Sequence, residues 1–431
     1  MKNNQATAQK TAFSAANILL PKKEHQSEAW AVCACDQYTG EPAYWAETER
    51  LVGEKPSTLR LILPELYLEE NDVTERIAAI QQTMRQYLID DMFDEYPAAM
   101  IYVERIQSDG LCRAGLVGTI DLEQYNYEKG SISPVRATEA TVAERIPPRM
   151  RIRSGAPMEL PHIMILLDDV KKAVIEPLAE KKSSMQIVYD TNLMQGGGSI
   201  KGWLVPADEQ ARILAALEQL GDPAVFAEKY HLPEGTAPLV YAMGDGNHSL
   251  ATAKAYYEQW KAAHPNADTA NCLPRYALVE LVNLHSPALQ FEAIHRILMQ
   301  IDPEALLADM TAALDLRTDS ESAQAMAIIQ NGKITKYYIH KPTSNLTVGS
   351  VQQFLDAWMK ENGGKIDYIH GADVVAKLAD QPNTMGILLP DMRKSELFPT
   401  VIADGALPRK TFSMGHAADK RFYMECRKIE E

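Results

Sequence analysis

The stretch LVYAMGDGNHSLATAKAYYEQW, residues 239–260, changes character abruptly in its middle. The run LVYAM is short and apolar, which is typical of a buried strand, whereas the residues from Leu250 onward are strong helix formers. The glycines between them tolerate backbone angles that a side chain forbids, and Ser249 is a residue type favoured at helix N-caps. The stretch therefore predicts a strand, a tight turn and a helix that begins near Ser249.

The start of such a helix is a place where anions bind. The first backbone N–H groups have no partner within the helix, and the helix dipole favours negative charge there. A phosphate or a carboxylate would fit the turn, with Gly244 and Gly246 allowing it to approach the backbone. The alternative is an ordinary strand-to-helix connection, in which Ser249 caps the helix and His248 lies hydrogen-bonded at the surface.

The composition is that of a soluble globular protein with more than one domain. Hydrophobic residues make up 46% of the 431-residue chain and charged residues 23%, and this length exceeds what one core usually organises. The formal net charge of −15 argues against non-specific binding of nucleic acid, which needs a basic face. No apolar run is long enough for a membrane span or an export signal, which favours a cytoplasmic location.

The cysteines have no spacing typical of a zinc site or a redox pair. They are Cys33, Cys35, Cys112, Cys272 and Cys426. In AVCACDQ a strand would point Cys33 and Cys35 to one face, and we interpret them as small buried side chains. No metal framework is indicated.

Alternating elements along the chain predict an α+β fold with mixed sheets. Helices are expected over 73–93, 170–182, 208–222, 304–315, 351–364 and 372–380, and strands over 99–106, 112–122, 162–169, 185–192, 200–206, 275–285, 325–330, 333–340 and 385–392. Asn331-Gly332 predicts a hairpin turn with positive φ at both residues. Residues 129–157, rich in Arg, Thr and Pro, are expected to form an extended loop.

Segments spread over most of the chain resemble a large bacterial family, the domain of unknown function numbered ten-fifteen. The turn DGNHS resembles the family's DGHHR, and VRATEATVAER (135–145) resembles its Arg-His-Glu-Lys-Thr loop. LVNLHSPALQFEAIHRIL (281–298) and LPRKTF (407–412) resemble its strand-and-His-Arg segment and its Pro-x-Lys-Ser-Thr loop. That family is related to ParB, sulfiredoxin and the free-serine kinases, so the resemblance implies a nucleotide-phosphate site at the turn.

Differences within the turn narrow the chemistry. Asn247 stands where sulfiredoxin has its reactive cysteine, which excludes that enzyme's thiol chemistry. His248 and Ser249 stand where ParB has two arginines that hold a triphosphate. The free-serine kinases carry Asp-Gly-His-His-Arg, of which Asp245, Gly246 and His248 are retained and the arginine is lost.

The likeness to free-serine kinases implies a nucleotide-dependent phosphotransferase that acts on a small hydroxylated metabolite, such as a free amino acid, with Mg²⁺ and ATP or ADP. Phosphoryl transfer needs a phosphate cradle, neutralising charge and a carboxylate. The backbone around the turn would be the cradle, His248 a donor to a phosphoryl oxygen, and Asp245 a base or a magnesium ligand. Glu209 is the nearest candidate for the kinases' catalytic glutamate, or else an acid that the helix dipole favours.

Cations from elsewhere in the chain would have to replace the missing arginine. The nucleotide- and phosphate-binding candidates are Gly244, Gly246, Asn247 and Ser249 in the turn, together with Arg136, Glu139, Thr141, Arg145, His295, Arg296, Arg409, Lys410 and Thr411. If these groups converge on the turn, they supply its missing charge; otherwise they are solvated charges or ion pairs.

We expect three regions: 1–160 with the hairpin and the Arg/Thr-rich loop, 161–300 with a ParB/sulfiredoxin-like core and the turn, and 301–431 with LPRKTF. The second functional hypothesis is a non-catalytic nucleotide- or metabolite-binding regulator, which the departures at Asn247 and Ser249 would allow. A metal-dependent hydrolase built on Asp245 and His248 lacks ligands. The expected partners are a nucleotide and a small molecule, not a membrane.

Overall fold

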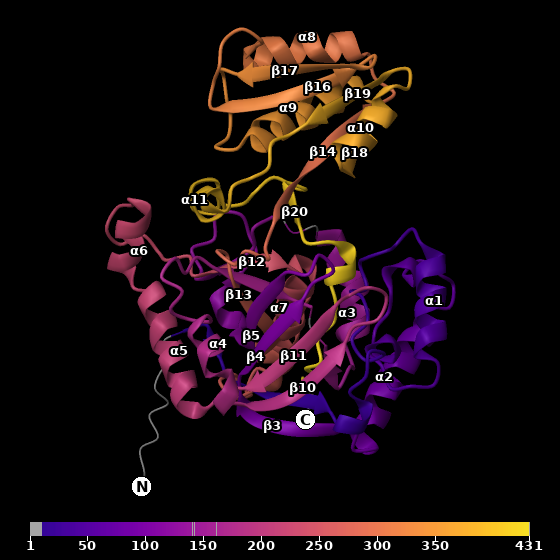
Figure 1. Ribbon diagram of the computed structural model, residues 1–431, viewed down its shortest axis with the longest axis vertical. Coiled ribbons are helices and arrows are strands. Elements are labelled where there is room, and N and C mark those ends of the chain that lie inside the picture. Colours follow the sequence, from indigo (N-terminus) through magenta and orange to yellow (C-terminus); the bar gives the residue numbers. More distant parts are fainter. Residues whose placement is uncertain (1–10, 140, 142, 161, 431) are drawn as a thin grey trace. The chain divides into compact units, whose positions relative to one another are not determined.

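The computed structural model describes residues 11–139, 141, 143–160 and 162–430. By their contacts the described residues form two compact units, each drawn in Figure 1. Unit 1 contains the chain up to 137, 141–289 and the residues from 415 onward, and unit 2 contains 138–140 and 290–414. The expected boundary after 160 falls inside unit 1, and the one after 300 falls shortly after unit 2 begins. Both units mix helices and strands, which confirms the α+β class.

Among the described residues, unit 1 is built around a ten-stranded mixed sheet in the order β10-β11-β4-β5-β13-β9-β12-β7-β6, with β1 paired to β5. The strands are β1 (Phe13–Ser14), β4 (Ile101–Ile106), β5 (Cys112–Asp121), β6 (Tyr125–Asn126), β7 (Val135–Arg136), β9 (Met164–Leu167), β10 (Gln186–Asn192), β11 (Ser199–Leu204), β12 (Tyr241–Asp245) and β13 (Tyr276–Asn283). Two shorter pairs accompany this sheet in the described part: β2 (Ala16–Pro21) with β3 (Phe93–Ala99), and β8 (Met158–Glu159) with β21 (Arg427–Lys428).

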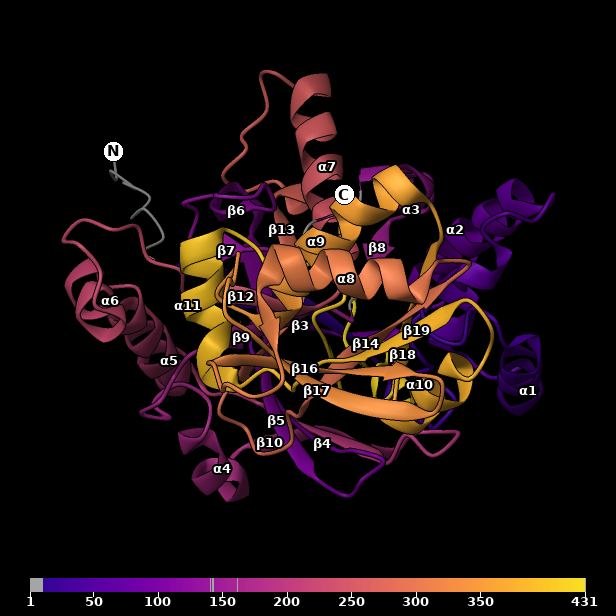
Figure 2. The same cartoon turned by 90° about the horizontal axis from the view of Figure 1, so that it is seen from above.

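Apolar side chains alternate between the faces of this sheet, so that each face carries its own core. On β5, Leu116 and Ile120 belong to one buried cluster and Val117 to the other. The helices are α1 (Pro42–Val52), α2 (Val73–Ile89), α3 (Ile146–Arg153), α4 (Pro177–Lys181), α5 (Ala207–Leu220), α6 (Pro223–Tyr230) and α7 (Asn247–Ala263). Within unit 1, α5 and α6 lie on the opposite side from α1 and α2 (Figures 1 and 2).

Unit 2 has, in its described residues, a seven-stranded sheet in the order β15-β17-β16-β19-β14-β18, with β20 paired to β14. The strands are β14 (Phe291–Met299), β15 (Leu316–Arg317), β16 (Gln324–Gln330), β17 (Lys333–Ile339), β18 (Lys365–His370), β19 (Thr384–Leu388) and β20 (Phe412–Met414). The helices are α8 (Pro303–Leu314), α9 (Thr347–Asn362), α10 (Ala372–Ala379) and α11 (Lys394–Asp404). Val375 and Ala379 of α10 pack on Ile297 and Ile329 of the sheet, and Figure 2 shows α8 and α9 on the other side.

Several sequence predictions about local structure were wrong. The segment 129–157 is not extended throughout, because Ile146–Arg153 form α3. In 170–182 only Pro177–Lys181 are α-helical, since a proline is tolerated in the first turn of a helix but not in its interior. Cys33 makes an isolated bridge to Arg421 and lies in no strand.

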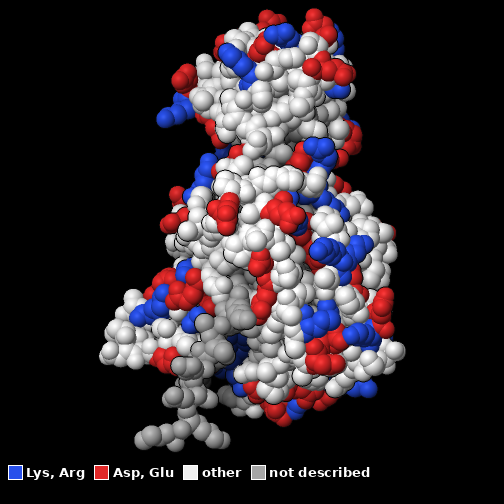
Figure 3. Space-filling model, turned by 90° about the vertical axis from the view of Figure 1, so that its left-hand side faces the viewer, with Lys and Arg blue, Asp and Glu red and all other residues white. Residues whose placement is uncertain are grey.

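Two further features are the distribution of charged side chains on the surface and the length and apolarity of the helices. On the face shown in Figure 3, acidic and basic side chains are interspersed rather than gathered by sign. Across the described ranges, none of the helices combines the length and the apolarity that a membrane crossing requires.

Candidate functional site

The turn between β12 and α7 has the predicted strand, turn and helix. Tyr241, Ala242 and Met243 of β12 are almost fully buried, and the strand ends at Asp245. Gly246 then adopts a φ of 80°, and α7 begins at Asn247 rather than near Ser249. Gly246, not Ser249, is thus the N-cap, because its left-handed conformation turns the chain directly into the helix. The N–H of Leu250 donates to the Gly246 carbonyl at 3.0 Å, so the hydrogen bonds of the helix begin at this turn.

Close packing at the turn requires a glycine. A Cβ placed on Gly246 would lie 3.1 Å from both Cα and Cγ1 of Ile163, which precedes the neighbouring strand β9. The N–H of Gly246 donates to Oδ1 of Asp245 at 2.8 Å, which fixes that carboxylate against the turn. The side-chain oxygen Oδ1 of Asn247 is buried and has no hydrogen-bond partner in the described part of the chain. The turn therefore presents backbone donors and one unsatisfied acceptor.

Side chains from distant segments surround this helix start. Lys420 Nζ lies 3.7 Å from Oδ2 of Asp245. His162 is buried, and its Nε2 lies 3.5 Å from Oγ of Ser249. Asp36 belongs to the same group: burial raises its pKa, but His162, a hydrogen bond from Gln37, Lys420 and Arg149 together hold the pKa below its ordinary value. The helix start thus has Lys420 and His162 beside it, and Asp36 lies close enough to both for their charges to lower its pKa.

A second acid lies close to the first but behaves differently. Burial raises the pKa of Glu65, and the repulsion of Asp36 adds to this effect, although Arg149, Arg145 and His162 oppose it. Arg149 bonds to Glu65 directly and donates to the carbonyl of Arg145 at 2.9 Å. Carboxyl groups whose surroundings push their pKa values apart are typical of acid–base chemistry. Arg145, which the sequence predicts in the site, takes part in this cluster because its charge lowers the pKa of Glu65.

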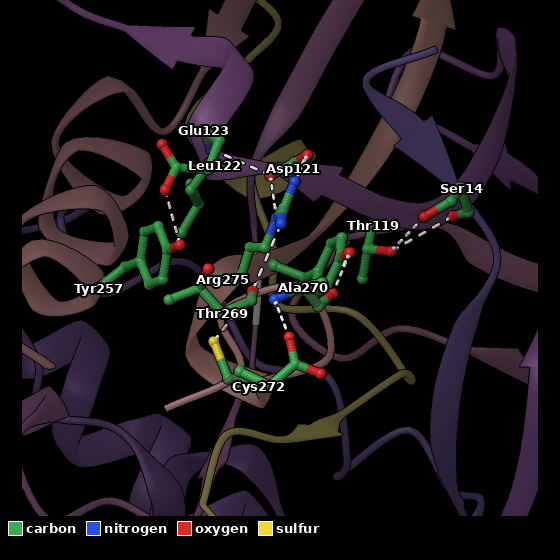
Figure 4. A network of polar contacts seen from close by, with 12 residues as sticks. Ser14, Thr119, Asp121, Leu122, Glu123, Tyr257, Thr269, Ala270, Cys272 and Arg275 are labelled. Carbon is green, nitrogen blue, oxygen red and sulfur yellow. Dashed lines mark hydrogen bonds and ion pairs between the residues drawn. The ribbon is translucent and has the colours of Figure 1, made fainter. Parts of the chain in front are cut away.

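Polar contacts also anchor the body of α7 (Figure 4). The Tyr257 hydroxyl donates to Glu123 at 2.7 Å. Arg275, after α7, bonds to both oxygens of Asp121 at 2.8 and 2.6 Å. The first bond holds α7 to the segment after β5, and the other two hold the chain after α7 to the end of β5.

Two other predicted residues have structural partners in unit 1. Glu209, in the first turn of α5, bonds to Lys181 and to Arg212, and these bonds lower its pKa. Arg136 is buried and donates to the carbonyls of Ser133, at 2.7 Å, and Ala237, at 3.0 Å. These contacts tie α5 and β7 to their neighbours, and a catalytic role for Glu209 stays a prediction.

The remaining predicted residues lie mostly in unit 2. Arg296 is fully buried, and burial lowers its pKa to about 10. Its Nη2 donates to the Arg409 carbonyl at 3.3 Å, and both guanidinium groups lie over the Tyr368 ring. Unit 2 thus brings two of the predicted cations together. Four other predicted residues belong to this unit. Glu139 forms an isolated β-bridge with Leu407, and His295 accepts a hydrogen bond from the N–H of Leu389. Thr411 donates to the Pro408 carbonyl, and its neighbour Lys410 has a positive φ. Thr141 belongs to unit 1. Convergence of the unit 2 group on the α7 turn stays a prediction.

Sequence reasoning missed most of the side chains around the turn. Asp36 directly follows the apolar run AVCAC, as Asp245 follows LVYAMG, and His162 stands just before the apolar strand MILL. A polar residue next to an apolar run was therefore the sequence signal that could have identified Asp36 and His162 as site residues. Nothing local marks Lys420 or Arg149, because only the fold brings them to α7.

Comparison with known proteins agrees with the resemblance seen in the sequence. The chain belongs to the family described as "Protein of unknown function (DUF1015)", which it matches over residues 16–358. Comparison with curated proteins gives no match.

Among solved structures, SbnI with C-terminal truncation from Staphylococcus aureus is 9% identical, with a TM-score of 0.37, and the match covers 69% of this chain and 82% of that one. A free serine kinase in complex with AMP is 10% identical, with a TM-score of 0.36 and coverage of 69% and 86%. A conserved hypothetical protein from Pyrococcus furiosus is 10% identical, with a TM-score of 0.34 and coverage of 69% and 90%.

Proposed function

We propose that the α7 turn binds the phosphates of a nucleotide and that unit 1 transfers a phosphoryl group to a small hydroxylated metabolite, such as a free amino acid. The observation that carries the proposal is the gathering of Lys420 and His162 at the start of α7, with Asp36 close enough to both for their charges to lower its pKa. Helix N-termini favour anions, and nearby cations strengthen that preference. The family resemblance implies the same class of activity.

Each group at the turn has a role in this proposal. Backbone N–H groups at the start of α7 hold phosphoryl oxygens, with His248 as a further donor and Lys420 as the neutralising cation that stands in for the missing arginine. Asp36 has a lowered pKa and stays ionised at neutral pH, so it suits the orientation and deprotonation of the accepting hydroxyl. Asn247 Oδ1, buried and unsatisfied in the described structure, would accept a hydrogen bond from a ligand.

A magnesium ion fits this donor set. Mg²⁺ is usually held by one or two carboxylates together with substrate phosphates, and Asp245 presents its Oδ2 beside the helix start. When bound, the ion would neutralise charge on the phosphates. Asp245 would hold it, which leaves Asp36 for the hydroxyl.

Thermal unfolding with and without ATP, ADP or AMP, each with and without Mg²⁺, tests the binding step. A ligand at a hundred times its Kd adds about 2.7 kcal/mol to the free energy of unfolding, so a millimolar nucleotide should raise Tm clearly. His248→Ala should lose part of the rise because one donor is gone. His264→Ala, on an exposed histidine at the other end of the same helix, should keep it.

Mass spectrometry of reactions with pooled amino acids and other hydroxylated metabolites tests the transfer step. A phosphorylated product that forms only with nucleotide supports the kinase-like activity. A nucleotide-dependent rise in Tm without any product would instead favour the non-catalytic regulator, to which the departures at Asn247 and Ser249 point. No change in Tm with any nucleotide would overturn both.

A further inference from the structure

A cavity of about 150 Å³ lies in unit 1 directly beside the α7 turn. Met84 of α2 and Ile152 of α3 line it, with Ser249 and Thr252 on the first turns of α7. His162 and Arg149, which surround the helix start, also line it. An α-helix rises 1.5 Å per residue, so Thr252 lies about 4.5 Å further along the axis than Ser249. The cavity therefore extends from the proposed phosphate site along the side of α7.

Much of the cavity wall is apolar. Its apolar residues include Leu61, Leu63, Met158 and Phe422, in addition to Met84 and Ile152. An apolar cavity of this volume is large enough for a benzene-sized group. Burying such a group contributes about 25 cal/mol for each Å² removed from water. A very polar molecule such as free serine would leave these walls uncovered.

One buried donor in the lining favours an anion. Arg149 and Arg153 line the cavity, but Arg149 is bonded to Glu65, and the lining carboxylate, Glu159, is bonded to Arg153 and Arg427. Nε of Arg153 is buried and has no hydrogen-bond partner among the described residues. A carboxylate on the bound molecule would accept from this donor.

We propose that the cavity is the acceptor site and that the acceptor is a hydroxylated carboxylic acid with an apolar body of up to about benzene size. This inference rests on the proposed function. Asp36 directly follows Cys35, which lines the cavity. The acceptor hydroxyl gives its proton to Asp36, its oxygen forms the new bond to the terminal phosphorus of the nucleotide, and the bond from that phosphorus to the bridging oxygen breaks. The products are the phosphorylated acid and the nucleotide shortened by one phosphate.

Binding of a graded series to the wild-type protein tests the apolar part. The probes are lactate, 2-hydroxybutyrate, 2-hydroxyhexanoate and 3-phenyllactate, titrated with ADP and Mg²⁺ present. We expect Kd to fall about fourfold for each added methylene, because each contributes about 0.8 kcal/mol on burial. Equal binding across the series, with the nucleotide effect on Tm intact, would overturn the acceptor site but leave the proposed function standing.

Filling the cavity tests its location. Ala156 is buried in the lining, and Ala156→Leu should weaken 3-phenyllactate binding at least tenfold while lactate binding and the nucleotide effect on Tm stay unchanged. Ala79→Leu, on the exposed face of α2, is the matched control and should change neither. If Ala156→Leu abolishes the nucleotide effect instead, the cavity holds the nucleobase and the assignment to the acceptor is wrong. If it fails to fold, the wild-type series decides.

Discussion

Lys420 Nζ lies 3.7 Å from Oδ2 of Asp245, so a residue from near the end of the chain supplies a cation to the strand-to-helix turn. The closing segment reaches this position because the core of unit 1 holds it. The Tyr423 hydroxyl donates to Glu280 on β13 at 2.7 Å, and Arg427 bonds to Glu159 at 2.8 Å. The backbone of the turn comes from one continuous stretch of sequence, but the charged and polar side chains beside it come from several separate segments.

Lys420→Met should weaken nucleotide binding at least about tenfold, because a hydrogen bond to a charged group is worth about 1.5–3 kcal/mol. Titration calorimetry with ADP and Mg²⁺ measures this change. Lys428→Met is a matched control, since Lys428 lies in the same closing segment but has its Nζ 3.7 Å from Glu95 of β3. Equal losses in the two variants would remove Lys420 from the site.

Gly246→Ala should destabilise unit 1 more than Gly235→Ala does. Both glycines have positive φ, 80° and 82°, and a left-handed conformation costs a non-glycine residue about 1–2 kcal/mol. Only at Gly246 would the new Cβ also meet Ile163, at 3.1 Å, whereas nothing lies within 4 Å at Gly235. Urea unfolding measures the difference, which we expect to be about 1 kcal/mol, from the few tenths of an ångström by which Ile163 must shift in a close-packed core. Folded Gly246→Ala should also lose the nucleotide effect on Tm; if it keeps the full effect, the turn is only a connector.

Asp36→Asn should abolish turnover and keep nucleotide binding. The folded-state pKa of Asp36 is lowered, so its contribution to stability is present above the ordinary pKa of 3.8 and is lost as pH falls through the lowered value. Wild type should therefore be more stable than the variant at pH 7, and the gap should shrink below pH 4. Chemical unfolding at pH 7 and below pH 4 measures this difference in stability, with Asp94→Asn on an exposed carboxylate as control. Retained turnover would assign the base elsewhere.

Local signals in the sequence predicted the local structure. Asn331 and Gly332 have φ of 51° and 71°, as their hairpin signature requires, because the two residues carry the turn by themselves. The strand, turn and helix around Gly246 were predicted for the same reason. The helix start was misplaced to Ser249 because a capping side chain and a left-handed glycine compete for the same role, and the glycine had the required geometry.

The sequence predicts a helix over 170–182, but Pro177 permits one only from its own position onward. The arrangement of the site, in contrast, is decided by tertiary contacts. Asp36, His162 and Lys420 belong to three separate segments, and no spacing between them carries a signal. Their approach to α7 depends on strand order in the sheet of unit 1 and on the path of the closing segment.

The buried carboxyl of Glu425 should make the stability of the protein fall as pH rises. Burial raises its pKa from 4.5 to about 7, although a hydrogen bond from the Tyr189 hydroxyl, at 2.7 Å, opposes the shift. The folded state therefore holds this proton more tightly than the unfolded chain, and the free energy of unfolding decreases between these pH values by up to about 3 kcal/mol. Glu425→Gln removes the titration and keeps an acceptor for Tyr189.

Urea unfolding at pH 5 and pH 8 measures the effect. The free energy of unfolding of the variant, relative to that of wild type, should rise by up to about 3 kcal/mol from pH 5 to pH 8, because only the wild type must ionise a buried group. Glu69→Gln, on an exposed glutamate, should follow the wild-type dependence at both. A constant difference between Glu425→Gln and wild type would show that Glu425 is already ionised at pH 5, held by Arg105, whose charge lowers the pKa of Glu425.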